Sequence, residues 1–527
     1  MNIKNNQYII IGSGPSGVSC ATALLKKNIK VLMVDSGNEL EKNVKNEISK
    51  LFNLEYEDWP KDVINKPPSK YYKGIPLKQC YGSNFIYKIS DPYKYHFKKN
   101  IGLRPSFAKG GFSNIWGAAI MPCNKNDIDD WPIKIKSLSP FYKEVMKLFD
   151  VSAQKDNLLK YFPIFKKKLI NLNLSEQGEI VHKNLKKNEK QLLKNGFFFG
   201  RSRLAFNKTN FSHKKGCIYC GSCLIGCPKK VIYSSLSTLK NLEKNKNFNY
   251  LPGITVTSLK EEKSEVFVNG IINKSKKKIL LKSKKVFVGA GVLQTTLIIA
   301  NTLKLKEYNF EIKDKTLVYL PLLLNKSIPN IYNSKINTLA QFFFEIKDKK
   351  LSEKFIHAQL YLYNQLYNRE INKFLFPLKL LFPKFLERLT SKLAILQIYL
   401  PSSESSKIVF KYNSSNPYKF DLKEKKNKNT KKLIKKVLKK IKLNKSMTGL
   451  YPLTFLNKVL PVGHSFHSGG TLPMSKKKNP RLCSDILGRP NNLKRIHCID
   501  ASVLPSIPST TVTLTVMANA FRIGSKA

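Results

Sequence analysis

The sequence predicts an α/β fold with two domains, one built on a parallel sheet and the other on a sheet covered by helices. Three observations lead to this prediction. The chain has 527 residues, whereas single hydrophobic cores stop growing at roughly 250–300 residues. An apolar, β-branched run at residues 8–11 continues through a glycine loop into an apolar helical segment and a second strand at residues 31–34. A strand, a glycine turn and an apolar helix follow one another again at residues 286–303.

The first glycine loop, Gly12-Ser-Gly-Pro-Ser-Gly17, has the spacing of a dinucleotide-binding fingerprint. Gly12 would allow the tight turn, Gly14 would let a pyrophosphate approach the backbone, and Gly17 would let the helix pack on the strand. Asp35 ends the second strand, where a carboxylate can accept hydrogen bonds from a ribose. A glycine-rich turn without a ligand is the alternative, and the motif does not separate FAD from NAD. Because strand, helix, second strand and acid occur together, we predict a Rossmann-like nucleotide site.

The high positive charge does not by itself predict a nucleic-acid-binding protein. Lys and Arg number 93 against 35 Asp and Glu, a formal charge of +58, but only nine of the 93 are Arg. Base recognition and bidentate phosphate contacts depend on Arg, so a lysine excess along the whole chain indicates compositional bias rather than a binding face. A hydrophobic share of 42% and an aromatic share of 11% exclude wholesale disorder.

We expect a cytoplasmic protein. Residues 7–17 hold the predicted strand and loop where a secretory signal would place its apolar segment, and no run of about 18 apolar residues could span a membrane. Contact with the inner membrane face is an alternative. Residues 431–442 place apolar side chains on one helical face with lysines around it, and residues 374–400 mix Phe and Leu with lysines. The simpler interpretation of residues 431–442 is a surface helix packed on its own domain.

Three later segments carry small polar and histidine side chains at close spacing. They are Lys109-Gly-Gly-Phe-Ser-Asn-Ile-Trp-Gly117, His464-Ser-Phe-His467-Ser-Gly-Gly-Thr471, and the stretch from Cys498-Ile-Asp500-Ala501 to Ser509-Thr-Thr-Val-Thr513 before a final helix. Together with the fingerprint and the glycine turn at residues 289–291, they resemble in kind and order the glucose-methanol-choline (GMC) family of FAD-dependent oxidoreductases. Five ordered motifs are far more specific than one glycine loop.

The resemblance implies FAD as the cofactor. The residues that it assigns to FAD are Gly12, Gly14, Gly17, Asp35, Gly111, Ser113, Asn114, Gly117, Ala290, Asp500, Ala501, Thr511 and Val512. Ser113 and Asn114 would lie near the isoalloxazine, and Asp500 would lie near the ribityl chain and pyrophosphate. The N-terminus of the last helix, near Thr511, would direct its positive dipole end toward the flavin and stabilise the reduced anion.

The resemblance also implies how the chain divides into domains. A discontinuous FAD-binding domain would consist of residues 1–130, 200–305 and 455–527, with a cysteine-rich loop at 210–232. Residues 131–199 and 306–454 would form the sheet-and-helix substrate-binding domain. The resemblance is weak or absent over roughly 40–85, 130–200 and 305–455, which includes most of that second domain.

His467 matches the position of the family's active-site histidine, and an imidazole with a pKa near neutrality suits a base that takes a hydroxyl proton. His464 lies one turn or one loop step away and is a second candidate. A buried structural histidine or an H-x-x-H metal pair are the alternatives. Thr511 occupies the position where the family usually has a second His or Asn; its hydroxyl can hydrogen-bond a substrate oxygen but is a poor base.

Four cysteines, Cys217, Cys220, Cys223 and Cys227, have the C-x₂-C-x₂-C-x₃-C-P spacing of ferredoxin clusters. A zinc site fits this spacing less well, and thiols without a metal are the third alternative. Fe–S-containing sugar dehydrogenases of the same family are similar here. That resemblance implies a [3Fe-4S] centre on Cys217, Cys223 and Cys227, or a [4Fe-4S] centre that also uses Cys220.

The sequence therefore predicts an FAD-dependent dehydrogenase that oxidises a hydroxyl group of a sugar, polyol or other alcohol. A cluster beside the flavin would pass electrons singly to an external acceptor, a protein or a quinone, rather than to O₂. A flavin and Fe–S electron-transfer or reductase component without an alcohol substrate is the first alternative. A zinc-containing, basic nucleic-acid-binding protein is the second, but it leaves the flavin-type motifs unexplained.

Overall fold

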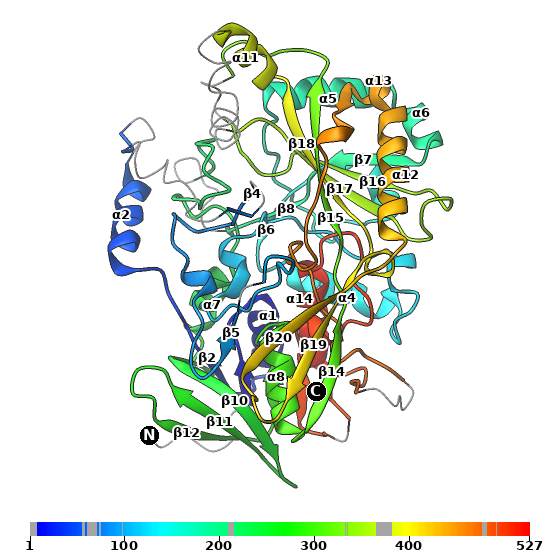
Figure 1. Ribbon diagram of the computed structural model, residues 1–527. Helices are drawn as coiled ribbons and strands as arrows, with labels where there is room; N and C mark the ends of the chain where they lie inside the picture. Colours follow the sequence, from blue (N-terminus) through cyan, green and yellow to red (C-terminus); the bar gives the residue numbers. More distant parts are fainter. Residues whose placement is uncertain are drawn as a thin grey trace.

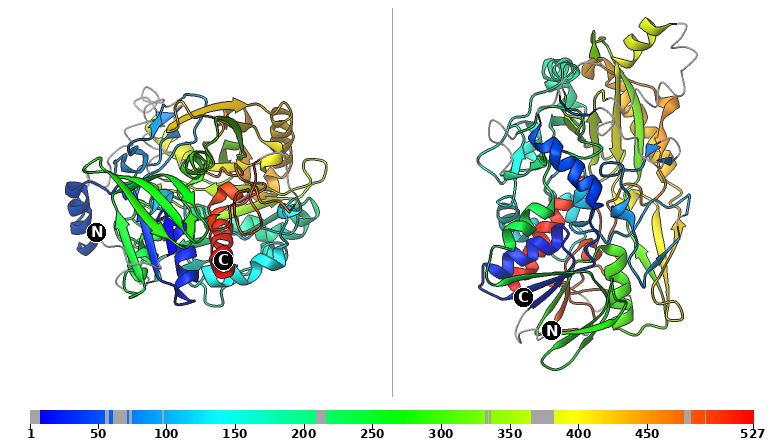
Figure 2. Two further views of the ribbon diagram at one scale, coloured as in Figure 1. Left: turned by 90° about the horizontal axis from the view of Figure 1, so that it is seen from below. Right: turned by 90° about the vertical axis from the view of Figure 1, so that its left-hand side faces the viewer.

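The computed structural model describes residues 8–54, 58–60, 71–72, 75–96, 98–208, 216–331, 334, 336–364, 382–476, 482–491 and 493–527. Part of the predicted segment 374–400 and residues 210–215 of the predicted cysteine-rich loop lie outside them. A parallel sheet lies at the end of the molecule that carries the C-terminus, and a larger antiparallel sheet lies at the other end (Figures 1 and 2).

The parallel sheet joins segments that lie far apart in the sequence. Its strand order is β23-β13-β1-β2-β9, and every neighbouring pair is parallel. The strands are β1 (Tyr8–Ile11), β2 (Val31–Asp35), β9 (Phe248–Pro252), β13 (Val286–Val288) and β23 (Ile496–Cys498). β1, β2 and β13 are apolar and almost wholly buried, as expected for strands covered on both faces. The predicted α/β class with a parallel sheet is confirmed.

Three buried helices follow the glycine-rich turns and the C-terminal segment. They are α1 (Pro15–Leu25), α8 (Val292–Thr302) and α14 (Thr513–Lys526), with α4 (Ile135–Val145) and α7 (Ser235–Leu242) beside them. α1 packs on α14, so the last helix lies against the first (Figure 1). An antiparallel sheet of β10 (Ile254–Glu261), β11 (Val266–Ile272) and β12 (Lys278–Ser283) connects β9 to β13.

The larger sheet is antiparallel and has two different faces. Its order is β21-β15-β18-β17-β16-β7, with β22 also paired to β15. The strands are β7 (Phe197–Arg201), β15 (Leu317–Leu324), β16 (Phe342–Ile346), β17 (Ile356–Tyr361), β18 (Leu393–Tyr399), β21 (Leu450–Pro452) and β22 (Lys458–Val459). One face packs in an apolar core with α5 (Glu176–Lys187), α6 (Glu189–Lys194) and α12 (Thr430–Leu443), while α13 (Lys445–Thr448) contacts α5 and β21. Because side chains alternate along a strand, the opposite face receives His357, Gln359 and Tyr361.

α12 contains the predicted amphipathic segment at residues 431–442. Its apolar residues Leu433, Ile434, Val437, Leu438 and Ile441 are buried in the same core as the antiparallel sheet. The interpretation as a surface helix packed on its own domain is confirmed, so this face is covered by protein and not free for lipid. Among the described residues, no helix has the length and apolarity needed to cross a bilayer.

The remaining elements are shorter. A four-stranded sheet contains β14 (Glu307–Ile312), β19 (Lys407–Asn413), β20 (Lys419–Lys425) and β5 (Lys94–Tyr95). Small strand pairs and peripheral helices complete the described elements: β3 (Tyr71–Tyr72), β4 (Ile75–Pro76), β6 (Asp150–Ser152), β8 (Leu204–Phe206), α2 (Lys42–Asn53) and α11 (Pro383–Thr390). The pairing of β5 with β20 joins the two predicted domains in one sheet, and the domain boundaries stay a prediction.

Candidate active site

A large cavity lies between the carboxyl ends of the parallel strands and the polar face of the antiparallel sheet. It encloses about 1860 Å³ of empty space, including its open mouth. The predicted site residues that line it are Gly12, Gly14, Asp35, Gly111, Ser113, Gly117, Ala290, Asp500, Ala501, Thr511, Val512 and His467. Gly17, Asn114 and His464 do not line it. The carboxyl edge of a parallel sheet is where ligands bind in open α/β folds.

The fingerprint glycines occupy positions that tolerate no side chain or that leave space for a ligand. Gly12 has φ +98°, and a Cβ there would lie 2.5 Å from the carbonyl oxygen of Gly289. A Cβ on Gly17 would lie 1.9 Å from the carbonyl oxygen of Gly12, so Gly17 serves the contact of helix and strand. A Cβ on Gly14 would meet nothing within 4 Å. This open side at the N-terminus of α1 fits a pyrophosphate.

Asp35 lines the cavity and is held by the fingerprint loop. Its Oδ2 accepts hydrogen bonds from the backbone N–H of Ser13, at 3.0 Å, and from the Ser13 hydroxyl. Its Oδ1 accepts the N–H of Gly37 at 3.1 Å. Burial raises the pKa of Asp35 to about 6, against these hydrogen bonds and the charge of Lys109, which lower it. Two carboxylate oxygens offer about four acceptor positions, so capacity remains for a ribose hydroxyl.

The loop at residues 110–117 is held by its own polar side chains. The hydroxyl of Ser113 donates to the carbonyl oxygen of Gly110 at 2.6 Å and accepts the N–H of Ser235 at 3.0 Å. The amide of Asn114 donates to the carbonyl oxygens of Lys109 and Gly111 at 2.9 and 2.7 Å. Asn114 therefore shapes the loop from behind, whereas Gly111 and Ser113 form part of the cavity wall.

Asp500 connects the second glycine turn to the C-terminal segment. Its Oδ2 accepts the N–H of Gly291 at 2.9 Å and the hydroxyl of Thr295 at 2.5 Å. Its Oδ1 accepts the N–H of Ser502 at 2.9 Å. Thr511 follows on the same wall; its buried hydroxyl has no hydrogen-bond partner among the described residues. An unsatisfied polar atom in a cavity wall is suited to meet a ligand.

His467 lines the cavity, and its imidazole is held in the neutral form. Burial lowers its pKa well below the usual value, and the charges of Lys315 and Lys78 act in the same direction. Its Nδ1 has no hydrogen-bond partner among the described residues. The preceding residue, Phe466, has φ +56°, a conformation that non-glycine residues rarely adopt. Such local strain clusters at functional sites.

His464 lies behind the cavity wall. It is 7% exposed, and its ring packs so closely on Gly102 that a Cβ there would lie 2.1 Å from its Nδ1. Burial lowers the pKa of His464 to about 4, with a further contribution from Arg104. Of the two histidines, only His467 therefore lines the cavity.

Asp314 fixes the loop that carries His467, and no sequence motif pointed to it. Its carboxylate, 1% exposed, accepts the N–H of Gly463 at 2.5 Å and the hydroxyls of Ser465 and Ser468 at 2.9 and 2.7 Å. The Ser465 hydroxyl in turn accepts the N–H of His467 at 3.1 Å. Asp314 therefore reaches His467 through Ser465 and is a positioning residue.

The polar face of the antiparallel sheet contributes a chain of four side chains. Glu345 contacts His357 Nδ1 at 2.5 Å, and the Nε2 atoms of His357 and Gln359 lie 3.0 Å apart. The phenol of Tyr361 donates to Gln359 Oε1 at 3.0 Å, and both Gln359 and Tyr361 line the cavity. Burial raises the pKa of Glu345 and lowers that of His357. Polar and apolar residues alternate in the sequence His-Ala-Gln-Leu-Tyr at residues 357–361. This alternation could have predicted a strand with one polar face.

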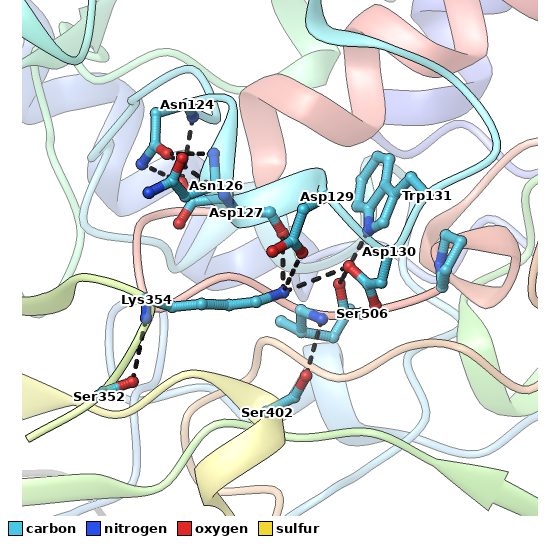
Figure 3. A network of polar contacts seen from close by, with 12 residues as sticks. Asn124, Asn126, Asp127, Asp129, Asp130, Trp131, Ser352, Lys354, Ser402 and Ser506 are labelled. Carbon is cyan, nitrogen blue, oxygen red and sulfur yellow. Dashed lines mark hydrogen bonds and ion pairs between the residues drawn. The ribbon is translucent and has the colours of Figure 1, made fainter. Parts of the chain in front are cut away.

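A second polar network braces the segment just before Thr511 (Figure 3). Lys354 forms ion pairs with Asp129 at 3.1 Å and with Asp130 at 3.2 Å. Asp130 also accepts the hydroxyl of Ser506 at 2.8 Å, and that hydroxyl accepts the indole N–H of Trp131 at 2.8 Å. The network thus connects the C-terminal segment to two other parts of the chain (Figure 3).

The four cysteines of the predicted metal site are neighbours in a loop. Burial, with a contribution from nearby thiols, raises the pKa of Cys223 to about 11 and that of Cys227 to about 12. Cys227 Sγ accepts the N–H of Val231 at 3.3 Å. No group of three or more His, Cys, Asp or Glu within the described residues could hold a metal ion. As placed, the thiols do not fit a bound metal, and no step below depends on one.

Comparison with known proteins agrees with this geometry. Residues 424–520, which include His467, Asp500 and Thr511, match the family model of the GMC oxidoreductases. The crystal structure of pyridoxine 4-oxidase from Mesorbium loti superposes with a TM-score of 0.61 at 11% identity, over 99% of this chain and 99% of that chain. At this identity the likeness shows the fold. No curated protein matches the chain. The C-terminal segment of the chain is thus similar to the GMC oxidoreductases, and the chain as a whole has the fold of the solved oxidase.

Proposed function

We propose that the chain is a dehydrogenase that oxidises a hydroxyl group of a sugar, polyol or other alcohol, with His467 as the base. The main support is the shared cavity, because the fingerprint loop, Asp500, Thr511 and His467 all line it. The open side of Gly14 and the unpartnered hydroxyl of Thr511 fit a bound FAD and its substrate. The FAD-binding residues named above stay part of this proposal.

FAD, when bound, supplies the acceptor for the hydride. The chain's own residues bind the alcohol and move its proton. His467 is neutral at neutral pH and accepts the hydroxyl proton at a ring nitrogen. The hydroxyl of Thr511 donates a hydrogen bond to the alcohol oxygen as negative charge develops there. The N-terminus of α14, which begins at Thr513, adds its positive dipole end to the same wall.

An absorbance spectrum of the purified protein and anaerobic mixing with a panel of sugars and polyols test the proposal. We expect a flavin spectrum and alcohol-dependent bleaching in the wild type. His467→Ala should keep FAD and lose bleaching by at least about 100-fold, the usual contribution of a general base. His464→Gln is the matched control and should bleach at nearly the wild-type rate. Equal bleaching by His467→Ala would refute the assignment of the base.

One substitution favours a second candidate function. Thr511 stands in place of an imidazole or amide, so the chain could instead be a flavoprotein electron-transfer or reductase component. Such a protein would bind FAD and accept electrons from a reduced nicotinamide or a protein donor. It would not bleach with any alcohol, which separates the two functions in the same experiment.

The predicted Fe–S cluster, the external acceptor and a peripheral membrane contact are separate proposals. The cysteine spacing alone supports the cluster, and the acceptor follows from the cluster. Iron and sulfide analysis with EPR of anaerobically purified protein tests it. Iron near three or four atoms per chain with an EPR signal would support it, whereas stoichiometric zinc or metal-free protein would refute it. Flotation with anionic liposomes tests the membrane contact.

A further inference from the structure

Lys78 lines the active-site cavity, and its ammonium group has no ion pair or hydrogen bond among the described residues. Its backbone is well anchored, because the carbonyl oxygen of Lys78 accepts the phenol of Tyr87 at 2.8 Å. Nearby, the N–H of Tyr81 donates to the carbonyl oxygen of Ile225 at 2.7 Å. The segment therefore holds an uncompensated cation at the cavity wall, where burial lowers the pKa of Lys78 and no acid opposes this effect.

Lys78 and His467 line the same cavity. The charge of Lys78 is one of those that lower the pKa of His467, which places the two groups within electrostatic range of each other. At the nucleotide end, Lys109 is the cation that lowers the pKa of Asp35, and Lys109 also pairs with Glu39 at 3.3 Å. The unpaired cation thus lines the same cavity as the predicted base and lies within electrostatic range of it.

A fully buried lysine of this region, Lys315, is already compensated. Lys315 donates to the carbonyl oxygens of Ser509 and Thr510 at 3.0 and 2.6 Å. The carboxylates of Asp314 and Glu345 raise its pKa against the effect of burial, leaving it at about 7. Lys78 is half-buried and has no comparable partner, and a charge partly removed from water without a partner is costly. A cation kept in a cavity under this penalty indicates that its counter-charge arrives with a ligand.

We propose that Lys78 binds an anionic group of the substrate, so that the enzyme acts on alcohols that carry a carboxylate or a phosphate. The inference rests on the proposed function, because it names the substrate class of the same site. An anion on Lys78 would fix one end of the substrate while its hydroxyl group faces His467. Neutral sugars and simple alcohols would lack this contact.

Binding to the FAD-loaded protein tests the proposal without turnover. The probes are glycolate against glycolamide, and glycerol 1-phosphate against glycerol, followed by the flavin difference spectrum and by calorimetry. We expect at least one anion to bind at least tenfold more tightly than its neutral partner. Lys78→Met should abolish this preference and Lys78→Arg should keep most of it. Lys109→Met is the matched control, which removes the same charge near Asp35, outside the cavity lining, and should preserve the preference.

Three outcomes would overturn the proposal. The first is equal binding of both anions and their neutral partners by the wild type. The second is an anion preference that survives in Lys78→Met or disappears equally in Lys109→Met. The third is loss of FAD affinity in Lys78→Met with the anion preference intact, which would assign the ammonium to the cofactor diphosphate. If anions bind through Lys78 but no alcohol bleaches the flavin, the proposed function fails and the anion site stands.

Discussion

Replacing Asp314 by Asn tests how the protein positions His467. The carboxylate accepts one N–H on Oδ2 and two hydroxyls on Oδ1. Asn keeps one acceptor oxygen for the two serines but turns an NH₂ group toward the N–H of Gly463. The charged hydrogen bond to Gly463 is then lost, at about 1.5–3 kcal/mol, and each serine bond weakens by about 1 kcal/mol.

These losses are partly offset, because burial raises the pKa of Asp314 and its ionised form is costly inside the protein. We therefore expect Asp314→Asn to lower the free energy of unfolding by about 2–3 kcal/mol. The larger effect should be kinetic, since misplacing a reacting group by about 1 Å can cost about 100-fold in rate. The FAD content should not change, because Asp314 does not line the cavity.

The assay combines urea unfolding with stopped-flow bleaching of the flavin by an alcohol that bleaches the wild type. Asp421→Asn is the control; Asp421 pairs with Lys98 at 3.0 Å on the surface, and its loss should change stability by less than about 1 kcal/mol. A folded, FAD-loaded Asp314→Asn variant with the wild-type rate constant would refute the positioning role.

Three further predictions concern single residues. The pKa of His497 is lowered to about 4, mainly by burial, so the unfolded chain binds its proton first; the wild type should lose about 2 kcal/mol more stability than His497→Asn between pH 7 and pH 5, and parallel urea curves would contradict this. Lys354→Met removes two ion pairs whose acids stay accessible to solvent and should cost about 1 kcal/mol, measured by urea unfolding; no change would show that the network in Figure 3 carries no net stability. Tyr361→Phe leaves Gln359 Oε1 without its donor and should lower kcat/KM about tenfold at unchanged FAD content; a change in FAD content alone would place Tyr361 at the cofactor instead.

The features that could be predicted from the sequence are those set by local geometry. Glycines at the positions of Gly12 and Gly17 are required where a strand turns closely into a helix. Their spacing in the sequence was therefore sufficient to predict the turn between β1 and α1. The placement of His467 in the cavity wall was not a local property, because its loop is held by hydrogen bonds that Asp314, far away in the sequence, accepts. Lys78 carried no motif at all; its role emerges only from the cavity that distant segments form around it.

The strand order of the parallel sheet also affects how the chain can fold. β1 contains residues 8–11, whereas the edge strand β23, beside β13, comes from residues 496–498. α14, which packs on α1, is formed by the last residues of the chain. During synthesis the first strand must therefore wait for nearly the whole chain before its sheet is complete, while the antiparallel sheet can already form. Such long-range pairing slows folding and leaves apolar strands exposed for longer, so removing α14 should impair the yield of folded protein before it affects chemistry.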